Sequence, residues 1–202
     1  MNPELNYRMA QVRQAEYTRE ADEWRRAVSA TTHGVVTSDG RRLSVRQLGP
    51  SDRSGLARLF DRLSPESRYR RFLSPKPRLS SRELTFLTEV DGCRHDAIAA
   101  VDDRDGSIVG TARYVRHADR RHVADFAIEV VDEFQRMCVG TALAGLTIHR
   151  ARANGVAALT ARTLWDNHGA RALLRRHGFR AVERDGGEIE YELALEPVTS
   201  AG

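Results

Sequence analysis

The sequence predicts an α/β (α+β) fold in which a mixed, mostly antiparallel sheet is flanked by helices. Three observations support this prediction. Short runs alternate apolar and polar residues with period two, as strands do, and longer segments repeat apolar residues every three or four positions, as helices do. The two kinds of segment also interleave along the chain, with glycine, proline and asparagine at their boundaries.

Residues 1–34 are predicted to form an N-terminal helical extension, and residues 35–198 a separate domain. Within the extension, Leu5, Met9 and Val12 follow a helical spacing among many charged residues, so the apolar stripe of a helix over 3–29 is thin. A stripe of this kind packs on the domain or on a second subunit, and we therefore expect a possible homodimer contact there.

The domain begins with a predicted hairpin, because the turn residues 38–40 precede an alternating strand at 43–48. Three helices follow, at about 51–63, 65–73 and 81–90. Serine and proline at their starts are typical of helix caps and of the first helical position.

The second half of the domain alternates strands and helices. The predicted strands span residues 97–101, 107–115, 122–131, 156–164, 180–184 and 188–195. The first three are joined by short turns and predict an antiparallel meander, whereas a helix at 140–153 separates the third from the fourth and predicts a parallel crossover. A last helix, 167–177, stops at Gly178.

The composition is that of a globular protein, with 41% hydrophobic and 30% charged residues among 202. No apolar run approaches the roughly 20 residues of a membrane-spanning helix, and we expect a cytoplasmic protein without membrane contact. Cys93 and Cys138 are isolated and the histidines are scattered, so we expect no disulfide framework and no metal site. The net charge of +4 is interspersed with acids, which does not favour nucleic-acid binding.

Residues 134–145 join a predicted strand to a helix, as a phosphate-binding turn does. The first amides of a helix lack carbonyl partners and lie at the positive end of the helix dipole, so they bind anions without a basic side chain. Small residues at Gly140 and Ala142 let a ligand approach the backbone. On these residues alone, an ordinary strand–helix connection is an equal alternative.

This turn resembles the acyl-CoA-binding signature of the GNAT (Gcn5-related N-acetyltransferase) superfamily, Gln/Arg-x-x-Gly-x-Gly/Ala, at Gln135, Cys138 and Gly140. The segment from Asn167 to Phe179 is similar to a second GNAT segment, and the order of elements over about 43–196 matches the GNAT fold. The resemblance implies acetyl-CoA as co-substrate and no metal.

A narrower resemblance connects Asp39-Gly40, Val45-Arg46, residues 63–72 and Val90-Asp91-Gly92 to the catalytic domain of the Pat-type bacterial protein lysine acetyltransferases. It implies transfer of an acetyl group to a primary amine, foremost a protein lysine. A small amine as acceptor and a non-catalytic acyl-CoA-binding sensor are the alternatives.

Acetyl transfer needs a neutral amine, and holding a lysine deprotonated at pH 7 costs about 4.6 kcal/mol, which a carboxylate base offsets. Asp125 and Glu129 share one face of their strand, opposite Phe126, Ile128 and Val130. By the resemblance, Asp125 stands at the position of the catalytic glutamate and is the predicted general base, acting through a water. Glu129 is the alternative, and a solvent-side polar role for both is the competing interpretation.

The resemblance also assigns the cofactor contacts. Turn amides would bind the pyrophosphate, the strand edge would pair with the pantetheine arm, and the side chain at the start of the last helix would contact the cofactor. The assigned residues are Ile128, Val130, Val131, Gln135, Arg136, Met137, Cys138, Val139, Gly140, Thr141, Ala142 and Asn167. For Asn167, a helix N-cap is an equally good explanation.

Two positions depart from the family pattern. Cys138 replaces the first glycine of the turn, so we expect weaker coenzyme A binding or an altered turn, and a thiol at a helix start is also a candidate for oxidation. Leu174 replaces the tyrosine that protonates the departing thiolate in many small-molecule GNAT enzymes, which favours the protein-acetylating branch. Tyr114 and Tyr191 are the other candidates for that proton donor.

Overall fold

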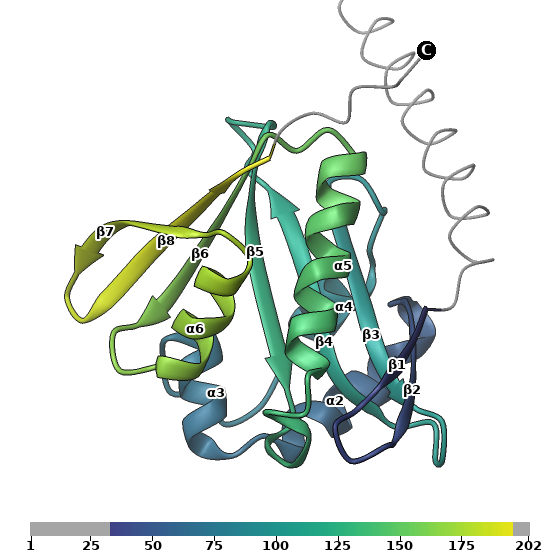
Figure 1. The fold of residues 1–202 in the computed structure, drawn as a ribbon. Coiled ribbons are helices and arrows are strands. Elements are labelled where there is room, and N and C mark those ends of the chain that lie inside the picture. The colour runs from purple at the N-terminus through teal and green to yellow at the C-terminus, as the bar shows by residue number, and fades with distance from the viewer. Residues whose placement is uncertain (1–32, 196–202) are drawn as a thin grey trace, which may run out of the picture.

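The computed structural model describes residues 33–195, which form one eight-stranded sheet with helices on both faces (Figure 1). The predicted helix at 3–29, and the homodimer contact expected from it, lie outside the described residues. The strands are β1 (His33–Val36), β2 (Arg42–Gln47), β3 (His95–Asp102), β4 (Ile108–Arg116), β5 (Val123–Val130), β6 (Ala158–Leu164), β7 (Arg180–Asp185) and β8 (Glu188–Ala194).

The spatial order of the strands is β1-β2-β3-β4-β5-β6-β8-β7. Every neighbouring pair is antiparallel except β5 and β6, which are parallel. This arrangement confirms the predicted mixed, mostly antiparallel sheet, and its single parallel pair is the crossover that the sequence places around the helix at 140–153.

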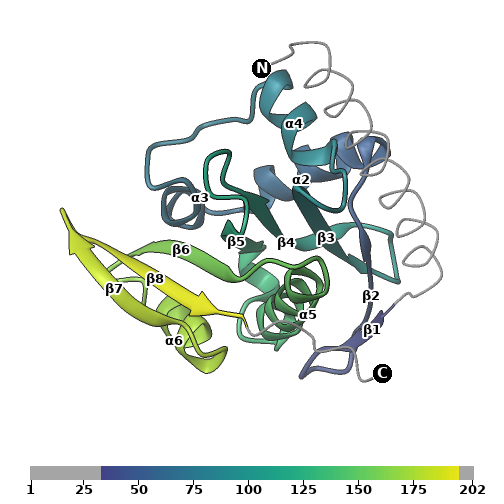
Figure 2. The same ribbon diagram turned by 90° about the horizontal axis from the view of Figure 1, so that it is seen from above.

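Two groups of helices cover the two faces of the sheet, as the view from above shows (Figure 2). The helices between β2 and β3 lie on one face, and those after β5 lie on the other. In chain order they are α2 (Arg53–Arg62), α3 (Pro65–Phe72), α4 (Ser81–Thr88), α5 (Val139–Ala153) and α6 (His168–Arg176), with 3-10 turns at Pro50–Asp52 and Asp132–Phe134.

Local sequence explains where the helices start. The Ser64 side chain accepts a hydrogen bond from the Ser67 amide, and Pro65 occupies the first position of α3. Ser80 and Glu83 form a capping box at the start of α4, in which each side chain accepts the backbone N–H of the other residue. These caps satisfy amides that would otherwise lack partners, and they fix the ends of helices too short to be stable alone.

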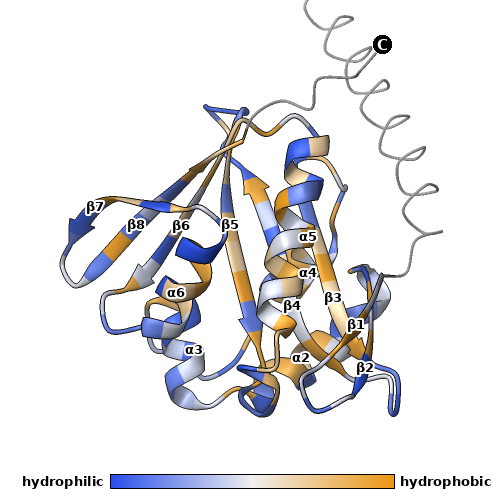
Figure 3. Ribbon diagram, in the orientation of Figure 1, coloured by the Kyte–Doolittle hydropathy of each residue, from blue (hydrophilic) through white to orange (hydrophobic). Residues whose placement is uncertain are grey.

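The core lies on both sides of the central strands, where apolar residues concentrate (Figure 3). Leu43 from β2, Phe60 from α2, Val109 from β4 and Leu143 from α5 are each at most 2% exposed. Each fully buried side chain of this size contributes about 1.5–3 kcal/mol. Gly110 on β4 suits this close packing, because a Cβ there would lie 3.1 Å from the Glu129 carbonyl oxygen, closer than an ordinary contact.

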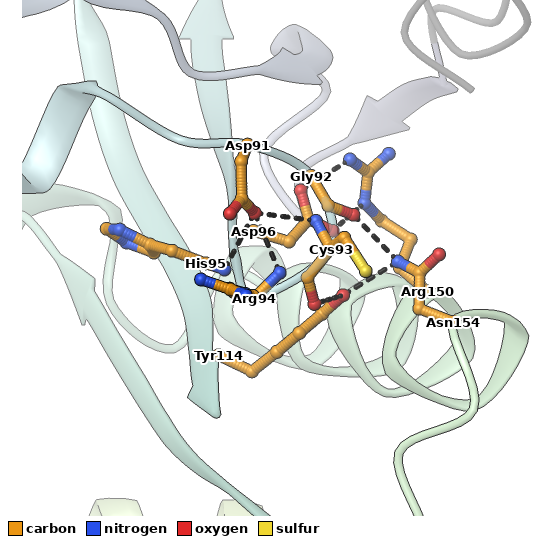
Figure 4. A network of polar contacts seen from close by, with 9 residues as sticks. All are labelled: Asp91, Gly92, Cys93, Arg94, His95, Asp96, Tyr114, Arg150 and Asn154. Carbon is orange, nitrogen blue, oxygen red and sulfur yellow. Dashed lines mark hydrogen bonds and ion pairs between the residues drawn. The ribbon is translucent and has the colours of Figure 1, made fainter. Parts of the chain in front are cut away.

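A polar network explains the Val90-Asp91-Gly92 motif (Figure 4). Asp91 Oδ1 accepts the backbone amides of Cys93, Arg94 and His95 at 2.8, 2.7 and 3.0 Å, which closes the turn between α4 and β3. Gly92 has φ +74°, a conformation that glycine adopts without strain. The motif therefore shapes a turn and does not line the groove described below.

The same network ties β3 and β4 to the end of α5. Asp96 forms a two-bond ion pair with Arg150, with both N–O distances at 2.7 Å. The Tyr114 hydroxyl accepts from Asn154 Nδ2 at 2.7 Å and lies 3.3 Å from the Cys93 carbonyl. These contacts hold the C-terminal end of α5 against the sheet.

The strands β5 and β6 pair only over a short stretch. Their parallel register joins residues 123–125 to residues 158–160, and beyond it the strands diverge, as Figure 1 shows. In contrast, β5 stays paired with β4 from Ala124 to Val130. One edge of β5 is therefore open where β6 leaves it.

No helix among residues 33–195 is long and apolar enough to cross a membrane.

Candidate active site

A cavity of about 870 Å³ occupies the opening between β5 and β6. Side chains of α3 line it on one face of the sheet, and residues at the start of α5 and along the length of α6 line it on the other. We call this cavity the groove. Because it passes between two strands, ligands can reach the same strand edge from both faces.

The alternation of β5 sorts its residues between the two faces. Glu129 bonds to Arg71 of α3, so Glu129 faces α3, and Asp125 faces the same side by the two-residue period. A Cβ added at Gly140 of α5 would lie 3.9 Å from side-chain atoms of both Ile128 and Val130, so these two side chains face the other side. The predicted division of acids and apolar residues between two faces is thus present.

The start of α5 offers free amides to the groove. Ala142 N–H donates to the Cys138 carbonyl at 3.0 Å, which is the first regular bond of the helix. The amides of Val139, Gly140 and Thr141 precede it and have no carbonyl one turn earlier to accept them. The amides left without a backbone partner at the start of the helix are therefore those of 139–141, and the Ala142 amide, which the sequence also assigns to the cofactor, is used by the helix itself.

Cys138 adopts a left-handed backbone conformation, with φ +67°. This conformation costs a residue with a Cβ about 1–2 kcal/mol and costs glycine almost nothing. A left-handed φ favours glycine, the residue of the family signature, and in this chain cysteine adopts it. Cys138 is exposed, lines the groove and makes no side-chain cap.

Gly140 is a different case, because the protein has room for a side chain there. The nearest atom to a Cβ at Gly140 would be Leu173 Cδ2 at 3.7 Å, an ordinary contact. Packing within the protein does not require glycine. Because Gly140 has no side chain, the helix amides are accessible from the groove.

The open edge of β5 follows from its register with β4. Val131 N–H donates to the Val109 carbonyl at 2.9 Å, so Val131 points toward β4, and by alternation the backbone groups of Ile128 and Val130 point into the groove. Val131 is fully buried. Its assignment as a cofactor contact is therefore not supported, because its amide is already used inside the sheet.

The remaining turn residues divide between groove and core. Gln135 lines the groove, and its Nε2 donates to the Val130 carbonyl at 3.0 Å and to Ser67 Oγ at 3.3 Å. Arg136 also lines the groove and has φ +59°. In contrast, the side chains of Met137 and Val139 pack on the core, so these two residues can offer only backbone groups.

Asp125 lies in the groove with its carboxylate held on one oxygen. Oδ1 accepts from Thr160 Oγ1 at 2.7 Å and contacts His117 Nε2 at 2.9 Å. The Asp125 side chain is 70% exposed, whereas the His117 side chain is 18% exposed. Sequence analysis missed His117, because its place beside Asp125 depends on the register of β4 and β5, which sets Val115 opposite Asp125.

Glu129 has the opposite environment. Its side chain is 8% exposed and accepts from Arg71 and Thr111, with Arg113 Nη2 at 3.6 Å. Burial alone would raise the pKa of Glu129, but the two arginines and the threonine outweigh burial and hold that pKa below its ordinary value. A carboxylate so stabilised in its charged form is a poor proton acceptor, which favours Asp125 as the base.

Asn167 serves the helix and the groove together. Its Oδ1 accepts the Ala170 amide at 3.1 Å as the N-cap of α6, and the residue also lines the groove.

Leu174 lines the groove as well, while Tyr114 and Tyr191 are fully buried outside it. Burial raises the pKa of Tyr114 above its ordinary value, which further disfavours it as a proton donor.

Within residues 33–195, no cluster of three or more His, Cys, Asp and Glu side chains is arranged to hold a metal ion.

The sheet opened between two parallel strands, with free helix amides on one face and a carboxylate on the other, is the architecture of an acyl-transferring enzyme. Residues 58–179, more than half of the chain, match the model of the acetyltransferase (GNAT) family. The protein therefore belongs to the GNAT family of acetyltransferases.

Its relatives include proteins of the Pat type. Acetyltransferase Pat of Mycolicibacterium smegmatis is 33% identical over 135 residues, which are 67% of this chain and 40% of Pat. The chain thus spans less than half the length of that relative. The GNAT domain of PAT from S. lividans has a TM-score of 0.76 and 27% identity, covering 81% of this chain and 97% of that domain.

A more distant structure shares the fold alone. The Salmonella typhimurium protein yncA, solved with its cofactor acetyl-CoA, has a TM-score of 0.63 and 13% identity, and the match covers 78% of this chain and 96% of yncA.

Proposed function

We propose that this protein is an acetyl-CoA-dependent N-acetyltransferase that modifies a primary amine, foremost the side chain of a protein lysine. The observation that carries the proposal is the groove, which offers free helix amides on the α5 face and the Asp125 carboxylate on the α3 face. An anionic cofactor and a basic amine can therefore approach the open edge of β5 from opposite sides.

The α5 face suits coenzyme A. The amides of 139–141 would hold its pyrophosphate, and the backbone groups of Ile128 and the N–H of Val130 would pair with the amides of the pantetheine arm, as a further strand would. Asn167 Oδ1 is used as an N-cap, so its Nδ2 is the atom to donate to the cofactor. The presence of acetyl-CoA in yncA, which has a similar fold, supports this choice of cofactor.

Asp125 supplies the base on the α3 face. Its carboxylate takes one proton from the incoming ammonium, directly or through a water, and the neutral nitrogen then attacks the thioester carbon. The C–N bond forms as the C–S bond breaks, the nitrogen gives up its second proton to water, and the departing thiolate takes a proton from water. An N–H of the open β5 edge is available to stabilise the developing oxyanion. In sum, an ammonium and acetyl-CoA give an acetamide, coenzyme A thiol and one proton.

A protein lysine is the favoured acceptor because the sequence motifs resemble those of the Pat-type protein lysine acetyltransferases, and the similarity of this chain to Acetyltransferase Pat and to the GNAT domain of PAT supports that resemblance. Leu174 in the groove, in place of a tyrosine, agrees with that choice. We place the reaction in the cytoplasm, an expectation from composition.

The test is to incubate the purified protein with labelled acetyl-CoA and a cell lysate that has been split into protein and small-molecule fractions. Label on lysines of the protein fraction supports the proposal. Label only in the small-molecule fraction contradicts the lysine assignment, and binding of acetyl-CoA by calorimetry without any transfer identifies a sensor.

Asp125→Asn tests the base. The variant keeps the size of the side chain and one oxygen that can accept from Thr160 and His117, but it cannot take a proton, so we expect kcat to fall about 100-fold or more while acetyl-CoA affinity stays within twofold. Glu129→Gln, by contrast, removes a buried ion-pair partner and should first reduce the thermal midpoint of unfolding. Full turnover by Asp125→Asn would remove Asp125 from the mechanism.

A further inference from the structure

We propose that His117 is a positioning residue for the general base: it holds Asp125 by one oxygen and leaves the other free to take the proton. The inference rests on the proposed function. His117 directly follows β4, and its own N–H donates to the Val123 carbonyl at 3.0 Å, which anchors the backbone that carries the ring.

The contact of His117 with Arg120 indicates which ring nitrogen of the imidazole carries the hydrogen. Arg120 Nη2 lies 3.2 Å from His117 Nδ1. A guanidinium group only donates hydrogen bonds, so Nδ1 must be the acceptor and the ring hydrogen of the neutral imidazole lies on Nε2. Nε2–H then donates to Asp125 Oδ1 at 2.9 Å. Arg120, His117 and Asp125 thus form a directed chain of hydrogen bonds.

Thr160 donates to the same carboxylate oxygen, with its Oγ1 2.7 Å from Asp125 Oδ1. Two donors, His117 just after β4 and Thr160 on β6, therefore converge on Oδ1. The carboxylate is fixed by this pair against rotation, and its other oxygen, Oδ2, is left for the amine. The His117 imidazole is little exposed and the Asp125 carboxylate is largely exposed, as expected if His117 positions a carboxylate that reacts with the substrate.

Within residues 33–195, the other charged groups of the groove do not bond to this carboxylate. They are Arg70, Arg71, Glu129, Arg136, Arg162, Arg176 and Glu190. Arg71 is engaged by Glu129 and Arg162 by Glu190, so Asp125 depends on His117 and Thr160 for its hydrogen bonds.

The first experiment compares His117→Ala with His117→Gln in the lysine-acetylation assay. Alanine deletes the donor, whereas the glutamine amide can place an N–H near the position of Nε2. We expect kcat to fall about 10-fold or more in His117→Ala, with the KM for acetyl-CoA within twofold, and to recover most of that loss in His117→Gln. His122→Ala is the matched control, because His122 is exposed in the same loop and does not line the groove.

The pH profile separates positioning from a general loss of structure. Loss of a donor to the charged carboxylate makes the proton harder to remove, so the acid limb of kcat/KM for the acceptor should move to higher pH in His117→Ala and not in His122→Ala. A wild-type kcat and an unmoved acid limb in His117→Ala would overturn the proposal.

A second measurement does not depend on activity. Long-range ¹H–¹⁵N spectra of the protein labelled with ¹⁵N-histidine report which ring nitrogen carries the hydrogen. We expect His117 as the Nε2–H tautomer in the wild type, and an Nδ1–H tautomer would contradict the proposal even if every variant folds poorly. If the wild type binds acetyl-CoA but acetylates no amine, the proposed function fails, while this tautomer still tests the contact itself.

Discussion

Asp125 and Glu129 are two carboxylates four positions apart on one strand, and their surroundings give them different chemistry. Glu129 is buried between two arginines and is held in its charged form, whereas Asp125 faces the groove with one oxygen free. Residue type and strand period identify both as candidates. The choice between them depends on contacts with distant residues. Arg71, which bonds to Glu129, lies 58 positions from it along the chain, and Thr160, which bonds to Asp125, lies 35 positions from it.

Cys138 provides a test at the residue scale. Cys138→Gly should raise the free energy of unfolding by about 0.5–1 kcal/mol, because relief of the left-handed strain exceeds the extra freedom of glycine in the unfolded chain. It should also strengthen acetyl-CoA binding, since a side chain beside the phosphate-binding amides is removed. Denaturant unfolding and calorimetry measure the two effects.

Cys138→Ala is the control for that experiment, because alanine removes the thiol but keeps a Cβ at the same φ. We expect no gain in stability from it. An equal gain from alanine and glycine would show that the thiol, and not the backbone conformation, was the source of the cost.

At the scale of elements, helix α5 contributes to stability and is the proposed site of the cofactor pyrophosphate, and changes at two of its glycines separate these roles. Gly140→Ala should leave the free energy of unfolding unchanged or raise it by up to about 1 kcal/mol, because the new Cβ meets no atom closer than 3.7 Å and alanine favours helix. It should weaken acetyl-CoA binding about 10-fold or more, since the methyl group stands over the amides that would hold the pyrophosphate.

Gly145→Ala is the matched change in the same helix. Its Cβ would lie 3.5 Å from His177 Cε1, and Gly145 does not line the groove. We expect a similar effect on stability and unchanged affinity. Equal affinities of the two variants for acetyl-CoA would argue against a cofactor at the start of α5.

Most elements were predictable because their signals are local. The Ser64-Pro65 start of α3 and the Gly178 stop each depend on a few neighbouring residues, and both stand where the sequence places them. Boundaries differ by a few residues: β6 begins at Ala158, not at 156, because Val156 and Ala157 bond to the Ala151 and His122 carbonyls in the connection.

For the whole molecule, burial of ionisable groups makes stability depend on pH. His95 is 7% exposed, stacks on Phe86 and accepts from Arg113. Burial, together with Arg113, lowers the pKa of His95 to about 4. Between about pH 6.5 and 4, His95 is therefore protonated in the unfolded chain but not in the folded protein. The free energy of unfolding falls as the pH falls through that window.

His95→Phe should reduce this pH dependence. Phenylalanine keeps the stack on Phe86 but takes no proton, so the loss in free energy of unfolding between pH 7 and pH 5 should be smaller than in the wild type, by about 2 kcal/mol at most. His177, whose pKa is also lowered by burial, keeps its share in both proteins. The exposed His149→Ala is the control, and an unchanged slope in His95→Phe would contradict the assignment.

By itself, the sequence determined the order of strands and helices, the turn before α5 and the face of β5 that carries the acids, because period, caps and turns are properties of neighbouring residues. Only the tertiary structure decided which acid is free, which amides remain unbonded and that His117 stands behind Asp125. Those properties arise where β4, β5, β6 and α3 meet, and contacts between segments far apart in the chain leave no local pattern to read.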